Sequence, residues 1–204
     1  MTQQAQPFLI TGMPFCETAW LSAFLNMGKT SICYLDPLGR LTSLEELKEL
    51  YRSNFYEFIG VADGGLAFFL DWMIDHVRPK IVILDRSVEE ADRDMAKQGI
   101  PATNYNELMR EELLRFRGDP NVLWVPNDML HEKRVAQKVF WHLLPGQAFD
   151  EVRFAEFDRY KIELDIVNTA RNNIERKKIF GNLLKDVIPR VHMKGNGHAP
   201  AAAA

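Results

Sequence analysis

A segment near the N-terminus carries the residues whose types and spacing could bind an anion. An apolar run at residues 8–11 leads into a turn with Gly12 and Pro14, and a helical pattern follows at residues 18–27. In phosphate-binding loops, the backbone N–H groups at the start of such a helix face the anion. This loop has no Lys or Arg, and its one charged residue, Glu17, is negative. The layout predicts a nucleotide-type phosphate site. The residues predict that this site no longer has the positive charge that holds a phosphate.

The side chains of this loop leave several roles open. Glu17 could fill the anion's place at the helix N-terminus, where a carboxylate gains roughly 0.3–1 kcal/mol, or it could act as a catalytic group. Cys16 could be a nucleophile, or a small substitute for Ser. Thr18 could bind a phosphate, although its hydroxyl is better suited to capping the helix.

The second candidate region follows the fully apolar run at residues 81–84, which ends in Asp85 and Arg86. Ligands of parallel sheets bind at the carboxyl ends of the strands, so we expect this pair on the same edge as the loop. A guanidinium is suited to bidentate phosphate binding, which makes Arg86 a candidate ligand. The alternative is an ion pair of Arg86 with Asp85, Glu89 or Glu90, and the sequence leaves both interpretations open.

A kinase or ATPase is not predicted, although Gly28-Lys29-Thr30 imitates the end of a Walker A motif. That motif needs Gly five residues earlier, where this chain has Ala23. A phosphate-binding loop also precedes its helix, whereas Gly28 follows one, so we interpret Gly28 as a helix C-cap.

Two carboxylates are the candidate general bases. Asp36 and Asp63 each follow a short strand-like run, which places them at the same sheet edge as the loop. The five His residues have no metal-ligand spacing, so we predict no metal site.

The alternation of strands and helices predicts a three-layer α/β fold with a parallel sheet between helices. The expected strands are residues 8–11, 31–34, 58–61, 81–84 and 121–125, and the expected helices are residues 18–27, 43–51, 66–77, 88–98, 106–116 and 131–144. Beyond residue 150 the strand signal ends, and residues 154–184 are mostly helical in pattern. We therefore expect an α/β core at 1–150, a helical extension at 151–190 and a tail at 191–204.

Composition and charge limit the partners and the compartment. The net charge is −3, which argues against direct nucleic-acid readout, and no apolar run reaches the ~20 residues that span a bilayer. Residues 171–204 carry seven Lys/Arg against two Asp/Glu, so they are a candidate contact to a protein partner or to another copy; a solvated face is the alternative. The polar N-terminus and the two cysteines favour a protein that no signal peptide secretes.

The loop resembles the first motif of the sulfotransferase family, a strand followed by G-x-P-[KR]-S-G-[ST]-[ST]-W-L. That motif clasps the 5′-phosphosulfate of 3′-phosphoadenosine 5′-phosphosulfate. The matching residues are Gly12, Pro14, Thr18, Trp20 and Leu21. Phe15, Cys16 and Glu17 stand where the family has a basic residue, Ser and Gly.

The region around Arg86 resembles the second family motif, an apolar strand that ends in Arg, with Ser eight residues further on. Together these two residues bind the 3′-phosphate in the family, and here the residue eight positions after Arg86 is Asp94. Residues 121–125 with Asp128 resemble a later strand of the family. Residues 141–149 are similar to small stand-alone relatives in bacterial and phage genomes, and the resemblance extends over about residues 7–165.

The resemblance implies a cofactor site at Gly12, Cys16, Glu17, Thr18, Arg86 and Asp94. The departures favour a degenerate member, a binding or structural component of the cytoplasm or of a phage virion, with no cofactor expected. The alternative is an active sulfotransferase. It would use 3′-phosphoadenosine 5′-phosphosulfate, with Arg86 on the 3′-phosphate, N–H groups near Thr18 on the 5′ end, and Asp36 or Asp63 as the base.

Overall fold

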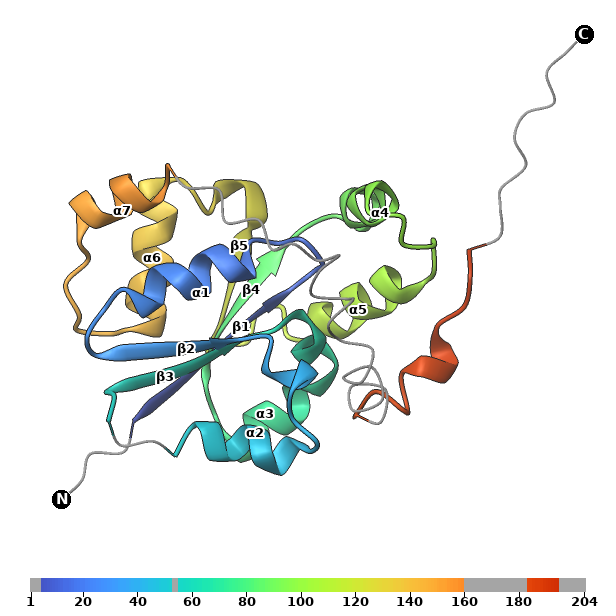
Figure 1. The fold of residues 1–204 in the computed structure, drawn as a ribbon, viewed down its shortest axis with the longest axis horizontal. Helices are drawn as coiled ribbons and strands as arrows, with labels where there is room; N and C mark the ends of the chain where they lie inside the picture. The colour runs from blue at the N-terminus through green and yellow to red at the C-terminus, as the bar shows by residue number, and fades with distance from the viewer. Residues whose placement is uncertain (1–4, 53–54, 160–182, 195–204) are drawn as a thin grey trace, which may run out of the picture.

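The computed structural model describes residues 5–52, 55–159 and 183–194, and its centre is a five-stranded parallel sheet (Figure 1). The strand order is β2-β3-β1-β4-β5. The strands are β1 (Gln6–Gly12), β2 (Ser31–Leu35), β3 (Phe58–Ala62), β4 (Lys80–Asp85) and β5 (Val122–Pro126). In register, Leu9 of central β1 lies between Val61 of β3 and Ile81 of β4. The apolar runs form the strands because both faces of a parallel sheet are buried.

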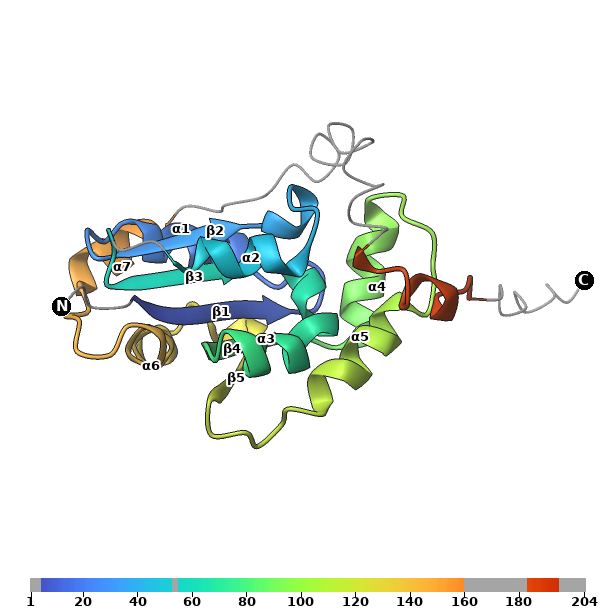
Figure 2. The same cartoon turned by 90° about the horizontal axis from the view of Figure 1, so that it is seen from below.

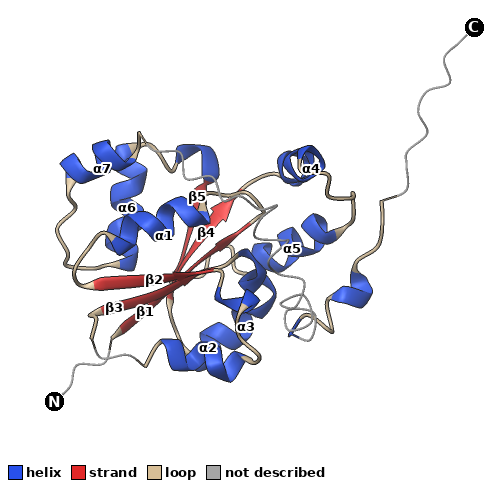
Figure 3. Cartoon of the chain, in the orientation of Figure 1, coloured by secondary structure: helices blue, strands red, loops and turns tan. Residues whose placement is uncertain are grey.

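Helices cover both faces of this sheet (Figure 3). They are α1 (Thr18–Asn26), α2 (Leu44–Leu50), α3 (Leu70–His76), α4 (Val88–Lys97), α5 (Tyr105–Leu114), α6 (Lys133–Leu143) and α7 (Glu151–Phe157). One hydrophobic layer joins α1, α6 and α7 through residues such as Trp20, Val139 and Phe154. The other joins α2, α3 and α5, with Leu47 and Met73 at its centre. The predicted three-layer α/β fold is confirmed.

The expected helix over residues 66–77 is wrong in one respect, because it is two helices. A 3₁₀ segment, Gly64–Phe69, precedes α3, and Phe69 separates them with φ −123° and ψ 16°. Asp63 caps the 3₁₀ segment by accepting a hydrogen bond from Gly65 N at 2.8 Å. The cap starts the 3₁₀ segment at Gly64, five residues before Phe69, and Leu66 is buried within this tighter winding.

The expected helix over residues 154–184 is described only at its ends. Helix α7 begins earlier, after Asp150, whose carboxylate caps it at Arg153 N, and it ends at Phe157. Residues 160–182 lie outside the described residues, as does most of the basic segment 171–204. Residues 183–194 hold the short 3₁₀ turn Ile188–Arg190 and one isolated β-bridge instead of a continuous helix.

Across the described part of the chain, every helix is too short or too polar to pass through a bilayer.

Substitution of Gly60 by Ala tests how closely β3 and β1 pack. A Cβ atom at Gly60 would lie 1.9 Å from the buried Phe8 ring, so the ring or the strand must move. We expect Gly60→Ala to lower the free energy of unfolding by about 1–3 kcal/mol in chemical denaturation. Gly39→Ala is the control, because no atom lies within 4 Å of the added Cβ. An equal effect of the two substitutions would contradict the packing.

Candidate functional site

A cleft of about 540 Å³ lies at the carboxyl edge of the sheet. The loop after β1 lines it, together with Asp36 after β2, Gly64 after β3 and the second half of α4. Arg86, at the end of β4, reaches this loop and donates a hydrogen bond from Nη1 to Phe15 O at 3.0 Å. The expectation that the loop and Arg86 share one sheet edge is therefore confirmed.

The loop keeps a shape that suits glycine better than the residues it contains. Phe15 and Glu17 have φ of 61° and 56°, in the left-handed region, which costs an L-residue roughly 1–2 kcal/mol each. Gly12 is required for a close approach, because a Cβ there would lie 2.3 Å from Leu84 O and 2.7 Å from Cys16 Sγ. The motif's glycine position, residue 17, thus retains a glycine-like backbone conformation with a carboxylate on it.

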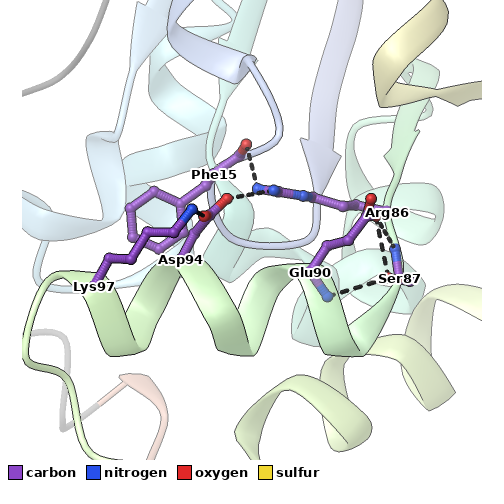
Figure 4. Close-up of polar contacts among 6 residues, drawn as sticks. All are labelled: Phe15, Arg86, Ser87, Glu90, Asp94 and Lys97. Carbon is purple, nitrogen blue, oxygen red and sulfur yellow. Dashed lines mark hydrogen bonds and ion pairs between the residues drawn. The ribbon is translucent and has the colours of Figure 1, made fainter.

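Arg86 is bound by the chain itself at both ends of its guanidinium (Figure 4). Besides the Phe15 carbonyl, its Nη2 forms an ion pair with Asp94 of α4. The other Asp94 oxygen accepts a hydrogen bond from Lys97 Nζ at 2.6 Å. The hydrogen bonds from Lys97 and Arg86 lower the pKa of Asp94, so this carboxylate is ionised at neutral pH. The residue expected in the second phosphate motif therefore neutralises the arginine of that motif.

The alternative of an ion pair for Arg86 is realised, but the expected partners were wrong. Asp85 pairs with Arg110 of α5 instead. Glu90 forms a capping box at the start of α4: Ser87 N donates to Glu90 Oε2 at 3.3 Å, and Glu90 N donates to Ser87 Oγ at 3.1 Å (Figure 4). The box fixes where α4 begins. Asp94 lies about two turns after Ser87, on the helix face toward the loop.

Glu17 is directed toward another element. It is the N-cap residue of α1, yet within the described residues its carboxylate accepts no capping hydrogen bond. Its Oε1 lies 4.0 Å from Nε2 of His131, and Nδ1 of His131 lies 2.5 Å from Asp158 Oδ1. The His131 ring also contacts the Trp20 ring edge-on, at 4.8 Å between centroids. The prediction that Glu17 takes the anion's place at the helix start is thus wrong, because its oxygens do not meet those N–H groups.

Sequence reasoning missed His131 and Asp158. No local motif links them to the loop, and only the packing of α6 and α7 beside α1 brings them there.

The surroundings of Cys16 and Thr18 decide between the roles that the sequence left open for them. The Cys16 side chain is 2% exposed, and burial raises its pKa to about 12, so its thiol stays protonated at neutral pH. This favours the small-substitute interpretation over a nucleophile. Thr18 is the first residue of α1, after the Glu17 cap, so the prediction that Thr18 caps the helix is wrong.

The two candidate bases differ in how they meet the cleft. Asp63 is 5% exposed, and it accepts hydrogen bonds from Gly65 N at 2.8 Å and Leu38 N at 3.0 Å. Burial, with the nearby Asp36 charge, raises its pKa to about 7. Asp36 lines the cleft, and burial raises its pKa while Arg40 opposes the shift. Asp63 thus ties two turns together, and Asp36 is the carboxylate that a ligand could meet.

Within residues 5–52, 55–159 and 183–194, no three His, Cys, Asp or Glu side chains are grouped closely enough to hold a metal ion.

Comparison with known proteins gives a structural similarity and no sequence match. No protein-family model matches the chain, and no curated protein matches it. Among solved structures, the chain is similar to a sulfotransferase from Alicyclobacillus acidocaldarius, with a TM-score of 0.45 and 12% identity over 89% of this chain and 96% of that one. Similarity at this level assigns no activity, so the functional conclusion depends on the residues of the cleft.

Buried Asp63 makes stability depend on pH. Its folded pKa of about 7 lies above the ordinary value of 3.8, so the folded chain holds a proton that the unfolded chain loses between these values. Its stabilising contribution is therefore present below about pH 4 and is lost as the pH rises to about 7.

We expect Asp63→Asn, which cannot titrate, to remove this decline. Urea unfolding of both proteins at several pH values measures it. The control is Asp75→Asn, an exposed carboxylate on α3. An unchanged slope in Asp63→Asn would show that Asp63 is ionised throughout.

Proposed function

We propose that this protein is a degenerate sulfotransferase-fold protein that acts as a binding or structural component and does not transfer sulfuryl groups. The observation that carries the proposal is the ion pair of Arg86 with Asp94, made while the same guanidinium binds the Phe15 carbonyl. In the pattern that the chain resembles, Arg and Ser at these positions hold a phosphate. Here the Asp94 carboxylate pairs with the positive charge of Arg86 that would otherwise bind a phosphate.

A phosphate would displace this carboxylate at a high electrostatic cost. Two like charges ~4 Å apart repel by about 4 kcal/mol at an effective dielectric of 20, and a phosphate dianion would experience more. Among the described residues that line the cleft, the cation is Lys97, and Asp94 pairs with it as well. Glu17 and Asp36 add negative charge to the lining of the same cleft. The charges of the cleft therefore oppose a nucleotide with two phosphate groups.

The direction of Glu17 supports the alternative, an active sulfotransferase. Because this side chain points toward His131, it leaves the N–H groups near Thr18 open to a 5′-phosphosulfate. In that case Asp36 would be the better placed of the two candidate bases, and Arg86 would have to exchange Asp94 for the 3′-phosphate. The two proposals differ in whether the chain as it stands binds the nucleotide.

Calorimetric titration with 3′-phosphoadenosine 5′-phosphate distinguishes them. We expect no binding by the natural chain at about 1 mM nucleotide, and binding by Asp94→Ser/Glu17→Gly that is at least about tenfold tighter, because Arg86 becomes free and the cleft loses two negative charges. Asp75→Ser/Glu89→Gly removes the same charges outside the cleft-lining set and should not bind. Micromolar binding by the natural chain would overturn the proposal and direct attention to acceptors.

A further inference from the structure

Residues 183–194, here called the C-terminal strap, lie against α4 and α5 (Figure 2). Leu184 is buried at 4% exposure, and Leu183 packs on the core layer that includes α5. The remaining strap residues are half-buried or exposed. The strap therefore lies on the surface of the domain and is anchored in the core through its first two residues.

The strap is held largely through its backbone. Residues 102–104 pair with residues 192–194, with Lys194 N donating to Ala102 O and Asn104 N donating to His192 O, both at 3.0 Å. The Asn104 side chain adds two bonds: its Oδ1 accepts from His192 N at 2.7 Å, and its Nδ2 donates to Arg190 O at 2.8 Å. Strand-like pairing combined with such backbone contacts is how proteins bind extended peptides.

Charge complementarity sets the register of the strap. Lys194 forms ion pairs with Asp92 of α4 and with Glu107 of α5, the latter at 2.9 Å. Arg190 pairs with Glu112, one turn and a half further along α5, at 3.2 Å. Two basic side chains four residues apart thus meet three carboxylates on the two helices. In the described part of the basic C-terminal region, Arg190 and Lys194 therefore pair with carboxylates of the same chain.

The contacts of the strap do not require that it come from the same molecule. Ile188 and Met193 are 51% and 63% exposed, so the apolar anchor of the strap is concentrated in Leu183 and Leu184, which a second copy would also supply. The 25 residues from 158 to 182 join it to α7, and a chain of that length can span at most about 90 Å. An identical strap from a second molecule would offer the same backbone and the same charges.

We propose that residues 102–104, α4 and α5 form a peptide-binding surface, here called the groove, that the strap of a second copy can occupy. The same groove holds the chain's own strap in the monomer, so the two compete. This proposal rests on the strap contacts alone and does not depend on whether the cleft binds a nucleotide.

A labelled synthetic peptide of residues 183–194 tests the groove in fluorescence anisotropy. In Lys194→Glu, repulsion from Asp92 and Glu107 should release the internal strap, and the full chain should then bind the peptide with a Kd below about 100 µM. The natural chain should bind at least about tenfold more weakly, because its tethered strap competes. Lys185→Glu, the same charge change at an exposed strap residue, should behave as the natural chain.

A second substitution, Asn104→Ala, tests the two hydrogen bonds between the Asn104 side chain and the strap backbone. Adding Asn104→Ala to Lys194→Glu should weaken peptide binding at least about tenfold, because two hydrogen bonds are lost. No peptide binding by Lys194→Glu, or binding unaffected by Asn104→Ala, would overturn the groove. Circular dichroism checks that each variant is folded, and Lys194→Ala replaces Lys194→Glu if it is not.

Mixing two full-length variants tests the second copy as occupant. Tagged Lys194→Glu has an intact groove, and untagged Asn104→Ala has an intact strap, so we expect the first to retain the second at about 100 µM. Neither variant should retain itself, since each lacks one half of the interface. Failure of the mixture to co-purify would overturn exchange between copies.

Discussion

The cleft depends on the guanidinium of Arg86, because it joins two segments that the sheet alone does not connect. A charge this close to the core must be paired, and Arg86 is paired with the loop carbonyl of Phe15 and with Asp94 of α4. The loop contains two residues in the left-handed region, so its shape costs free energy. Arg86 offsets part of that cost with a contact that needs no ligand. The protein can thus keep the outline of a phosphate loop without an anion in it.

Helix α4 links this ion pair to contacts on its other face. Within α4, Ala91 is the buried residue, so polar contacts and the Ser87–Glu90 box largely fix its position. Asp94 faces the cleft, whereas Asp92 meets Lys194 of the strap and the side chain of Asn106. The strap therefore holds the same helix that supplies the partner of Arg86. Partly exposed ion pairs weaken with salt, so added salt should weaken both the Arg86–Asp94 and the Lys194–Asp92 pair.

Local patterns in the sequence were sufficient for the fold class and most of the elements. Buried parallel strands are continuous apolar runs, and the three inner strands β1, β3 and β4 were located from such runs because burial on both faces leaves no alternation. The outer strands β2 and β5 are only partly buried, and shorter apolar stretches located them. The Ser43 cap of α2 follows from a local rule, and its Oγ does accept from Glu46 N. The gathering of Arg86 and the loop at one edge follows from parallel topology. Each of these features is decided within a few residues or by strand direction.

Only the tertiary structure decided which charges meet. Spacing marked position 94 as part of a phosphate motif, but the pairing of Asp94 with Arg86 depends on where α4 begins and which face it turns. Glu17 meets His131 because α6 packs beside α1, and nothing near either residue indicates it. Likewise, the basic strap was visible as an excess of charge, whereas its carboxylate partners lie about 80–100 residues away along the chain. Electrostatic partners are set by distance in space, which the sequence fixes only through the complete fold.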